Sequence, residues 1–310
     1  MIDVCLLGTG GMMPIPGRWL TSLMVRYKGH QILIDCGEGT QITMKKRGWS
    51  ANPIDMILFT HYHADHISGL PGMLLSMANA ERKDPVIIAG PRGLENVVNS
   101  LRVIAPGLPF EIRYHELTQP QETILFPGEK EFIIRAFKVQ HRVTCYGYTL
   151  ELLRIGKFQP EKARELGLPV TAWGKLQHGA SYVTADGRTI LPEQVLGPSR
   201  KGLKLTYTTD TRPCPQIIEA AEGADLFICE GMYGDDEKKK DAESKKHMTF
   251  TEAARLAAAA KPVQLWLTHY SPSLVHPEEF IESVRKIFPE SIAARDGRSV
   301  TLKFEEEADE

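Results

Sequence analysis

Short apolar runs separated by polar turns recur along most of the chain, and they predict a protein rich in buried strands. Continuous apolar runs of this length are typical of strands that are covered on both faces. They lie at residues 2–7, 23–27, 31–35, 56–60, 132–139, 203–208, 225–229 and 263–268. Helices are predicted instead at residues 40–47, 249–260 and 277–288. This mixture of strands and helices indicates an α/β fold class.

Short sequence signals between these elements predict the start of one helix, a tight turn, a loop and a frayed tail. Thr249 and Glu252 have the spacing of a capping box, which marks the start of a helix. The glycine turn at residues 8–11 lacks the Gly-Lys-Ser/Thr sequence of a P-loop, so we expect a tight turn beside the functional site. Residues 238–246 mix charges of both signs and are predicted to form a solvated loop. The acidic residues 305–310 are predicted to form a frayed tail.

The strongest chemical signal follows the predicted strand at residues 56–60. Three histidines and one aspartate lie within six residues there: His61, His63, Asp65 and His66. Imidazole and carboxylate ligands together suit zinc, and also manganese or iron. On a loop that leaves a strand, His61 and His63 can hold one ion while Asp65 and His66 turn toward a second. Three histidines at this spacing are hard to explain by a purely structural role.

Four later strands also end at a residue that can bind a metal or transfer a proton. These residues are His141, Asp210, Glu230 and His269. Because ligands bind at one edge of an α/β sheet, we expect the four side chains to converge with the histidine cluster. Random placement would scatter residues of these types through helices and loops as well. The repeated strand-end position is therefore the second argument for a metal site.

The amino-acid composition limits the classes of protein to which the chain can belong. Among 310 residues, 37 are Lys or Arg and 39 are Asp or Glu, which gives a formal net charge of −2. A general polyanion-binding protein is usually basic, so any nucleic-acid surface must be local. The five cysteines are scattered without a Cys-x-x-Cys pair, which is typical of buried thiols in a reducing compartment. We see no signal peptide and no apolar run that could span a membrane, so we expect a cytoplasmic protein.

The order His-x-His-x-Asp-His of residues 61–66 resembles the metal signature of the metallo-β-lactamase superfamily. The resemblance implies a single domain, residues 1–310, with a four-layer αββα sandwich and a hydrolytic site for two metal ions. The implied ligands are His61, His63 and His141 for the first ion, Asp65, His66 and His269 for the second, and Asp210 for both. We expect two zinc ions (Zn²⁺) that hold a bridging hydroxide, with Mn²⁺ or Fe²⁺ as alternatives.

A narrower resemblance runs from about residue 3 to about residue 275. Segments at residues 8–11, 35–41, 66–72, 167–169, 186–188, 197–198 and 210–214 are similar, in order, to motifs of the ribonuclease Z family of tRNA 3′-processing endonucleases. The resemblance implies removal of the 3′ trailer of precursor tRNA. It further implies that Glu230 orients His247, which donates a proton to the leaving 3′ oxygen. Asp65 is expected to be a metal ligand, and it could also accept the proton of the attacking water.

The chain departs from the family pattern in two places. The family's Pro-x-Lys-x-Arg-Asn loop reads Pro14-Ile15-Pro16-Gly17-Arg18-Trp19 here, so its lysine and asparagine are replaced. Arg18 is expected to meet phosphate, and Trp19 either stacks on a base or packs in the core. The family's flexible tRNA-binding arm corresponds to about residues 154–174, which lack the usual Gly-Pro pair.

Residues 154–174 are still predicted to be a substrate-binding arm, with an ordinary surface helix as the alternative. The segment carries several cations, including Arg154 and Lys157, in a chain that is otherwise slightly acidic. Such cations would meet tRNA phosphates and add salt dependence to binding. We also expect a homodimer. Three apolar side chains would either pack the arm on itself or bind the partner: Phe158, Leu166 and Leu168.

The same residues are compatible with three other classes of function. A phosphodiesterase for small diesters or cyclic nucleotides would share every metal ligand and differ at Arg18, Trp19 and the arm. An RNA-binding module with a structural zinc would need only four ligands in a closed site. Lactonase or thioesterase chemistry makes less use of the Glu230 and His247 pair. We therefore predict a zinc-dependent hydrolase, an endonuclease for precursor tRNA, with the small-diester enzyme as the alternative.

Overall fold

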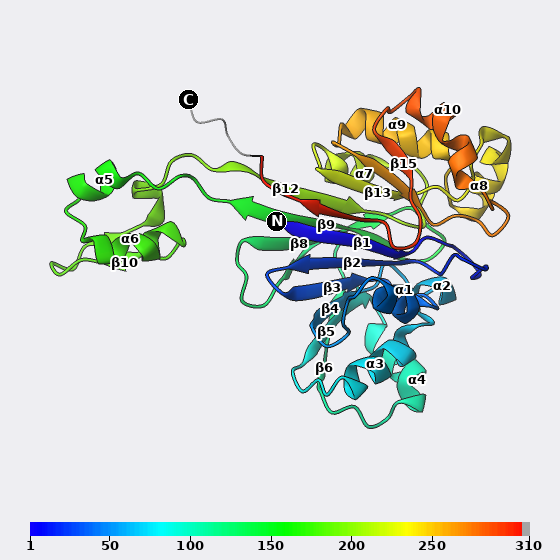
Figure 1. The fold of residues 1–310 in the computed structure, drawn as a ribbon, viewed down its shortest axis with the longest axis horizontal. Coiled ribbons are helices and arrows are strands. Elements are labelled where there is room, and N and C mark those ends of the chain that lie inside the picture. Colours follow the sequence, from blue (N-terminus) through cyan, green and yellow to red (C-terminus); the bar gives the residue numbers. More distant parts are fainter. Residues whose placement is uncertain (306–310) are drawn as a thin grey trace.

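Two seven-stranded sheets lie face to face in the computed structural model, which describes residues 1–305 (Figure 1). The first sheet has the order β16 (Ser299–Leu302), β1 (Ile2–Gly8), β2 (Ser22–Tyr27), β3 (His30–Ile34), β4 (Ile54–Leu58), β5 (Val86–Pro91) and β6 (Ile112–Leu117). The second has the order β15 (Ser291–Ala293), β14 (Leu265–Thr268), β13 (Leu226–Glu230), β12 (Arg200–Tyr207), β9 (Cys145–Arg154), β8 (Phe132–Val139) and β7 (Gln121–Leu125). The predicted buried strands are all present.

Helices cover the outer face of each sheet (Figure 1). The first sheet is covered by α1 (Thr40–Lys46), α3 (Leu70–Asn79) and α4 (Leu94–Leu101), with the short α2 (Ala64–Ile67) beside them. The second is covered by α7 (Pro215–Ala221), α9 (Phe250–Ala260) and α10 (Ile281–Arg285), with α8 (Lys239–Lys245) nearby. The largest apolar cluster fills the space between the sheets. These layers form the αββα sandwich that the resemblance implied.

Two predictions of local structure need correction. Residues 238–246 are not a solvated loop, because a 3₁₀ turn (Asp236–Lys238) leads there into helix α8. Ala242 on that helix is buried against Met232 and Tyr233, a long-range contact that charge pattern alone does not reveal. The helix predicted at 277–288 is shorter, since it begins as a 3₁₀ turn (Pro277–Phe280) and α10 ends at Arg285.

A separate lobe projects from one end of the second sheet (Figure 1). The chain leaves β9 at Arg154 and returns to β12 at Arg200, so the lobe is longer than the predicted 154–174. It contains α5 (Pro160–Glu165), α6 (Val170–Gln177), a two-stranded sheet of β10 (Tyr182–Val183) and β11 (Thr189–Ile190), and a 3₁₀ turn (Pro192–Gln194). Its own small core includes Leu168, while Phe158 and Leu166 pack against that core. The three apolar residues therefore pack the lobe on itself.

Three remaining predictions concern cysteines, membrane spans and the tail. All five cysteines are buried and unpaired, as their spacing predicted. Within residues 1–305, no helix has the length and apolar character needed to cross a membrane. The predicted acidic tail lies outside the described residues except for Glu305, which is exposed.

Candidate active site

The residues predicted to act together converge at the end of the sheets opposite the lobe. Strands β12, β13 and β14 are parallel neighbours, so their carboxyl ends share one edge of the second sheet. The carboxyl end of β4 in the first sheet meets the same place. The residues brought together are His61 and His63 after β4, Asp65 and His66 in α2, His141 after β8, Asp210 after β12, Glu230 at the end of β13, and His269 after β14.

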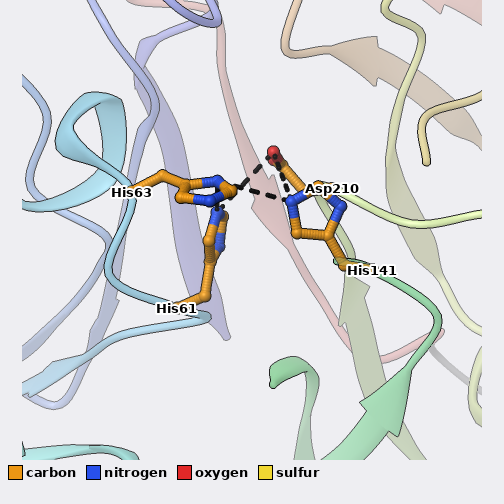
Figure 2. A group of neighbouring side chains, drawn as sticks. All are labelled: His61, His63, His141 and Asp210. Carbon is orange, nitrogen blue, oxygen red and sulfur yellow. Dashed lines mark hydrogen bonds and ion pairs between the residues drawn. The ribbon is translucent and has the colours of Figure 1, made fainter. Parts of the chain in front are cut away.

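One group of ligand atoms forms around Oδ2 of Asp210 (Figure 2). His61, His63, His141 and Asp210 each place one atom within 4.8 Å of all the others. Nδ1 of His63 lies 2.9 Å from Nε2 of His61 and 3.4 Å from Nε2 of His141. Oδ2 of Asp210 lies 3.6 Å from Nε2 of both His61 and His141. Three imidazoles and one carboxylate are a ligand set that zinc accepts.

A second group forms on the other oxygen of Asp210. Oδ1 of Asp210 lies 3.1 Å from Nε2 of His66 and 3.0 Å from Nε2 of His269. Asp65 completes this group, with Oδ2 at 3.3 Å from Nε2 of His269 and 3.6 Å from Nε2 of His66. Asp210 therefore offers one oxygen to each group, which is the arrangement of a bridging ligand.

A buried carboxylate decides which nitrogen of His66 faces the second group. Nδ1 of His66 lies 2.8 Å from Oδ2 of Asp35, and both side chains are fully buried. Nδ1 is therefore placed to donate its proton to Asp35, which leaves Nε2 as the nitrogen that faces Asp210 and His269. Oδ1 of Asp210 is also a buried acceptor, without a hydrogen-bond partner in the described part of the chain. Imidazole nitrogens and carboxylate oxygens grouped this closely are ligands that a divalent metal accepts, so these residues fit such an ion.

The glycine turn after β1 forms one wall of the site, as predicted. A Cβ atom on Gly11 would lie 2.7 Å from Cε1 of His269, so no side chain fits there. The next residue, Met12, has a φ of 66° and donates its N–H to Oδ2 of Asp65 at 2.7 Å. A positive φ is uncommon for a residue with a side chain. This turn leaves room for His269 and orients Asp65.

Glu230 and His247 form a hydrogen-bonded pair beside the ligands. Nδ1 of His247 lies 3.2 Å from Oε2 of Glu230, and Nε2 lies 3.9 Å from Oδ2 of Asp210. The N–H of Thr211 donates to the other oxygen of Glu230 at 2.5 Å. Burial by itself lowers the pKa of His247, but the carboxylates of Glu230, Asp210 and Asp65 together outweigh it and raise this pKa to about 9. A protonated imidazole whose Nε2 faces the ligands is suited to donate a proton.

The two residues expected to contact substrate near the site have protein partners. The guanidinium of Arg18 donates to the main-chain oxygens of Leu274 and Val275, each at 2.8 Å. Trp19 is half-buried and packs against Gly39, where a Cβ atom would lie 2.0 Å from the indole ring. Phosphate binding by Arg18 would compete with its carbonyl bonds. These contacts favour the core-packing alternative for Trp19 and a structural role for Arg18.

Arg154 and Lys157 lie at the base of the lobe, away from the ligand groups. The guanidinium of Arg154 lies 4.7 Å from the centre of the Phe304 ring and donates to the main-chain oxygen of Glu305. The main-chain oxygen of Lys157 accepts the N–H of Gly197 at 2.8 Å, which joins the two sides of the stem. Any role of these cations in binding RNA therefore belongs to the lobe and its stem, not to the metal site.

Two contributors to the site were not predicted as functional residues. Asp35 follows an apolar strand, the same position that singled out Asp210 and His269, so this signal could have identified it. Arg212 bonds to Glu252 and to the main chain of His247, and no local pattern in the sequence indicates this contact.

Comparisons with known proteins agree with this geometry. Two family models match the chain, "Anti-Pycsar protein Apyc1" over residues 2–144 and "Beta-lactamase superfamily domain" over residues 160–270. A ribonuclease Z of Lachnospira eligens is 60% identical over 99% of this chain and 100% of the relative. A ribonuclease Z of Lachnoclostridium phytofermentans is 58% identical over 98% of this chain and 99% of the relative. The chain belongs to the ribonuclease Z family.

Membership of the ribonuclease Z family confirms the narrower resemblance seen in the sequence. It makes the chain a hydrolase that cleaves RNA on the metallo-β-lactamase fold, and the grouped histidines and aspartates indicate that it depends on metal. The crystal structure of human tRNase Z, short form, matches with a TM-score of 0.69 and 24% identity, over 97% of this chain and 100% of that one. That likeness supports the fold of this ribonuclease Z-family chain.

Proposed function

We propose that this protein is an endonuclease that removes the 3′ trailer of precursor tRNA. The observation that carries the proposal is the Glu230 and His247 pair beside two ligand groups that share Asp210, in a chain similar to ribonuclease Z over nearly its whole length. Phosphodiester cleavage needs an activated water, neutralisation of charge on the phosphate and a proton for the leaving oxygen. The site offers residues for each requirement.

Zinc is the metal we propose, with two ions per chain. His61, His63 and His141 would hold one ion, Asp65, His66 and His269 the other, and Asp210 both. When bound, the two ions supply an activated water at neutral pH and neutralise charge on the phosphate. Mn²⁺ or Fe²⁺ would satisfy the same nitrogen and oxygen ligands. The neutral Nε2 of His66, set by Asp35, suits any of these ions.

The proton for the leaving 3′ oxygen is assigned to His247. Its Nδ1 is held by Glu230, so Nε2 is the atom left to face the substrate. Glu230 is in turn held in place by the N–H groups of Thr211 and Met248. Burial raises the pKa of Glu230, and the neighbouring imidazole of His247 opposes that rise. Asp65 is proposed as a metal ligand, and its second oxygen is the candidate acceptor for the proton of the attacking water.

The lobe at residues 155–199 is proposed to be the tRNA-binding arm of a single metallo-β-lactamase domain. Its base at Arg154 lies at one end of β9, and the metal-site end of that strand is Cys145. Ten extended residues at about 3.3 Å each place the base of the lobe about 30 Å from the site. A homodimer could bring the lobe of one copy toward the site of the other, so we propose a dimer.

Because all five cysteines are free thiols, we propose a reducing, cytoplasmic location.

Incubation of the zinc-loaded protein with a 3′-extended precursor tRNA tests this function. We expect a single cut that leaves a 3′-hydroxyl on the tRNA and a 5′-phosphate on the trailer, because His247 protonates the 3′ oxygen. End-group mapping of both products gives the answer, and an Asp210→Ala protein serves as the inactive control. Hydrolysis of small diesters or cyclic nucleotides without any cut in the precursor would replace this function by the phosphodiesterase alternative.

A further inference from the structure

Arg212 connects the ligand side of the active site to the segment that carries His247. It lies two residues after Asp210, and its side chain is only 15% exposed. Its two terminal nitrogens donate to the two oxygens of Glu252 at 2.9 and 2.5 Å. The nitrogen Nη1 also donates to the main-chain oxygen of His247 at 2.5 Å. One planar guanidinium is thus bound to the peptide of the proton donor and to a carboxylate on α9.

Glu252 is a rigid anchor for this arginine. Its Oε2 accepts the N–H of Thr249 at 3.1 Å, while the hydroxyl of Thr249 accepts the N–H of Glu252 at 3.3 Å. This capping box fixes the first turn of α9, whose N-cap Thr249 lies only two residues after His247. The hydroxyl of Thr249 also donates to Asp236 at 2.6 Å. Glu243 is a second carboxylate near Arg212, but it lies 4.0 Å away and is exposed, so it contributes little.

Residues 210–212 also bind Glu230, the carboxylate that pairs with His247. The main-chain N–H of Thr211 donates to Glu230, whose second oxygen holds Nδ1 of His247. The main chain of Arg212 is itself tied to the residue before His141, since its N–H donates to the oxygen of Gln140 at 2.9 Å. The side-chain oxygen of Thr211 accepts the N–H of Gln140 at 3.0 Å. Contacts from residues 210–212 therefore reach both His141 and His247.

We infer that Arg212, anchored by Glu252, is a positioning residue that sets the distance between the proton donor His247 and the metal ligands. The inference rests on the proposed function, because it assumes that His247 protonates a leaving oxygen. Without Arg212, the main-chain oxygen of His247 loses this donor. The segment then keeps the bonds of the Met248 N–H to Glu230 and of the Lys246 oxygen to Nδ1 of His141, together with the bond of the His247 N–H to the Ala242 oxygen of α8 at 2.9 Å. That helix has seven residues, of which only Ala242 is buried. A proton donor must lie within hydrogen-bonding reach of the leaving atom, so a small shift of this segment lowers the rate.

Arg212→Met, which removes both contacts of the guanidinium and keeps the aliphatic length, tests the inference. We expect kcat on precursor tRNA to fall by about 10- to 100-fold while KM changes by less than about twofold. On bis(4-nitrophenyl) phosphate, whose leaving group needs little protonation, the loss should stay below about threefold. In a His247→Ala background the same substitution should cost less than about threefold on either substrate, because its target is gone. Zinc content measured in parallel should stay at the wild-type level.

Two further variants keep the test informative if Arg212→Met folds poorly. Arg212→Lys retains the charge and one bond, so it should recover part of the kcat on precursor tRNA. Glu252→Gln preserves an acceptor for the N–H of Thr249 but loses the ion pair, and it should show a smaller loss with the same dependence on the leaving group. Equal losses on the two substrates, or an undiminished loss in the His247→Ala background, would overturn the positioning role. If His247→Ala itself lost activity equally on both substrates, the acid role in the proposed function would fail first.

Discussion

Arg154 and Arg200 face each other as antiparallel partners at the open ends of β9 and β12, although the whole lobe lies between them in sequence. The two strands are thus already held together at the base of the lobe by the sheet. A short turn could join them without stretching the chain, because antiparallel strands can be linked by hairpins of two to five residues. The lobe can therefore be removed at a site that the fold itself defines.

Replacing residues 155–199 by a Gly-Ser-Asn-Gly turn should separate tRNA binding from chemistry. KM for precursor tRNA should rise by at least about tenfold and become less sensitive to salt, since phosphate contacts are lost. Turnover of bis(4-nitrophenyl) phosphate should stay within about threefold, because no proposed metal or acid–base residue lies in the lobe. Steady-state kinetics at several salt concentrations measure both effects. An unchanged KM for precursor tRNA would argue against the lobe as the binding arm.

Asp35→Asn should weaken metal binding without disturbing the backbone. Asp35 has a φ of 58°, a left-handed conformation that asparagine also tolerates. The substitution removes the charge that holds Nδ1 of His66 and fixes its tautomer. Loss of such a partner typically costs about 10- to 100-fold in metal affinity. Competition against a chelator measures this, with Asp55→Asn as a control, because Asp55 holds the remote His30 at 3.0 Å in the same way. Equal effects of the two substitutions would contradict the assignment.

Protein purified without chelator should contain about two divalent ions per chain, mainly zinc when the medium supplies it. His269→Ala removes a ligand of one group only, so the content should fall toward about one ion per chain. His276→Ala, on an exposed histidine elsewhere, should leave the content unchanged. Elemental analysis of the three proteins decides the question. One ion in the wild-type protein, unaffected by His269→Ala, would rule out the dinuclear site.

Asp65→Ala and His247→Ala should fail in different ways. Asp65 lies in a ligand group, so its loss should lower zinc content and activity on every substrate. His247→Ala should retain zinc and lose about 10²- to 10⁴-fold on precursor tRNA, which is the usual contribution of a general acid. On bis(4-nitrophenyl) phosphate the loss from His247→Ala should be much smaller. Parallel zinc analysis and kinetics on both substrates separate the roles, and a matching pattern for the two variants would refute the assignment.

Much of the candidate site could be predicted from the sequence because its signals are local. Each strand is an apolar run, and the residue after it, such as Asp210 or His269, is placed at the sheet edge by the strand itself. The capping box of Thr249 and Glu252 was predictable for the same reason, since its two residues are neighbours on one helical turn. The family resemblance then supplied the αββα layering and the division of the ligands between two metal ions, which local patterns do not contain.

Tertiary structure decided the contacts between residues that are distant in sequence. Asp35 selects the metal-facing nitrogen of His66 only because β3 and β4 are parallel neighbours, which places their ends side by side. The guanidinium of Arg18 is taken up by carbonyl groups of a loop near residue 275, and α8 forms because the main body covers Ala242. A side chain's partner depends on what the fold places within about 3 Å of it, and a single sequence records the side chain but not that neighbour.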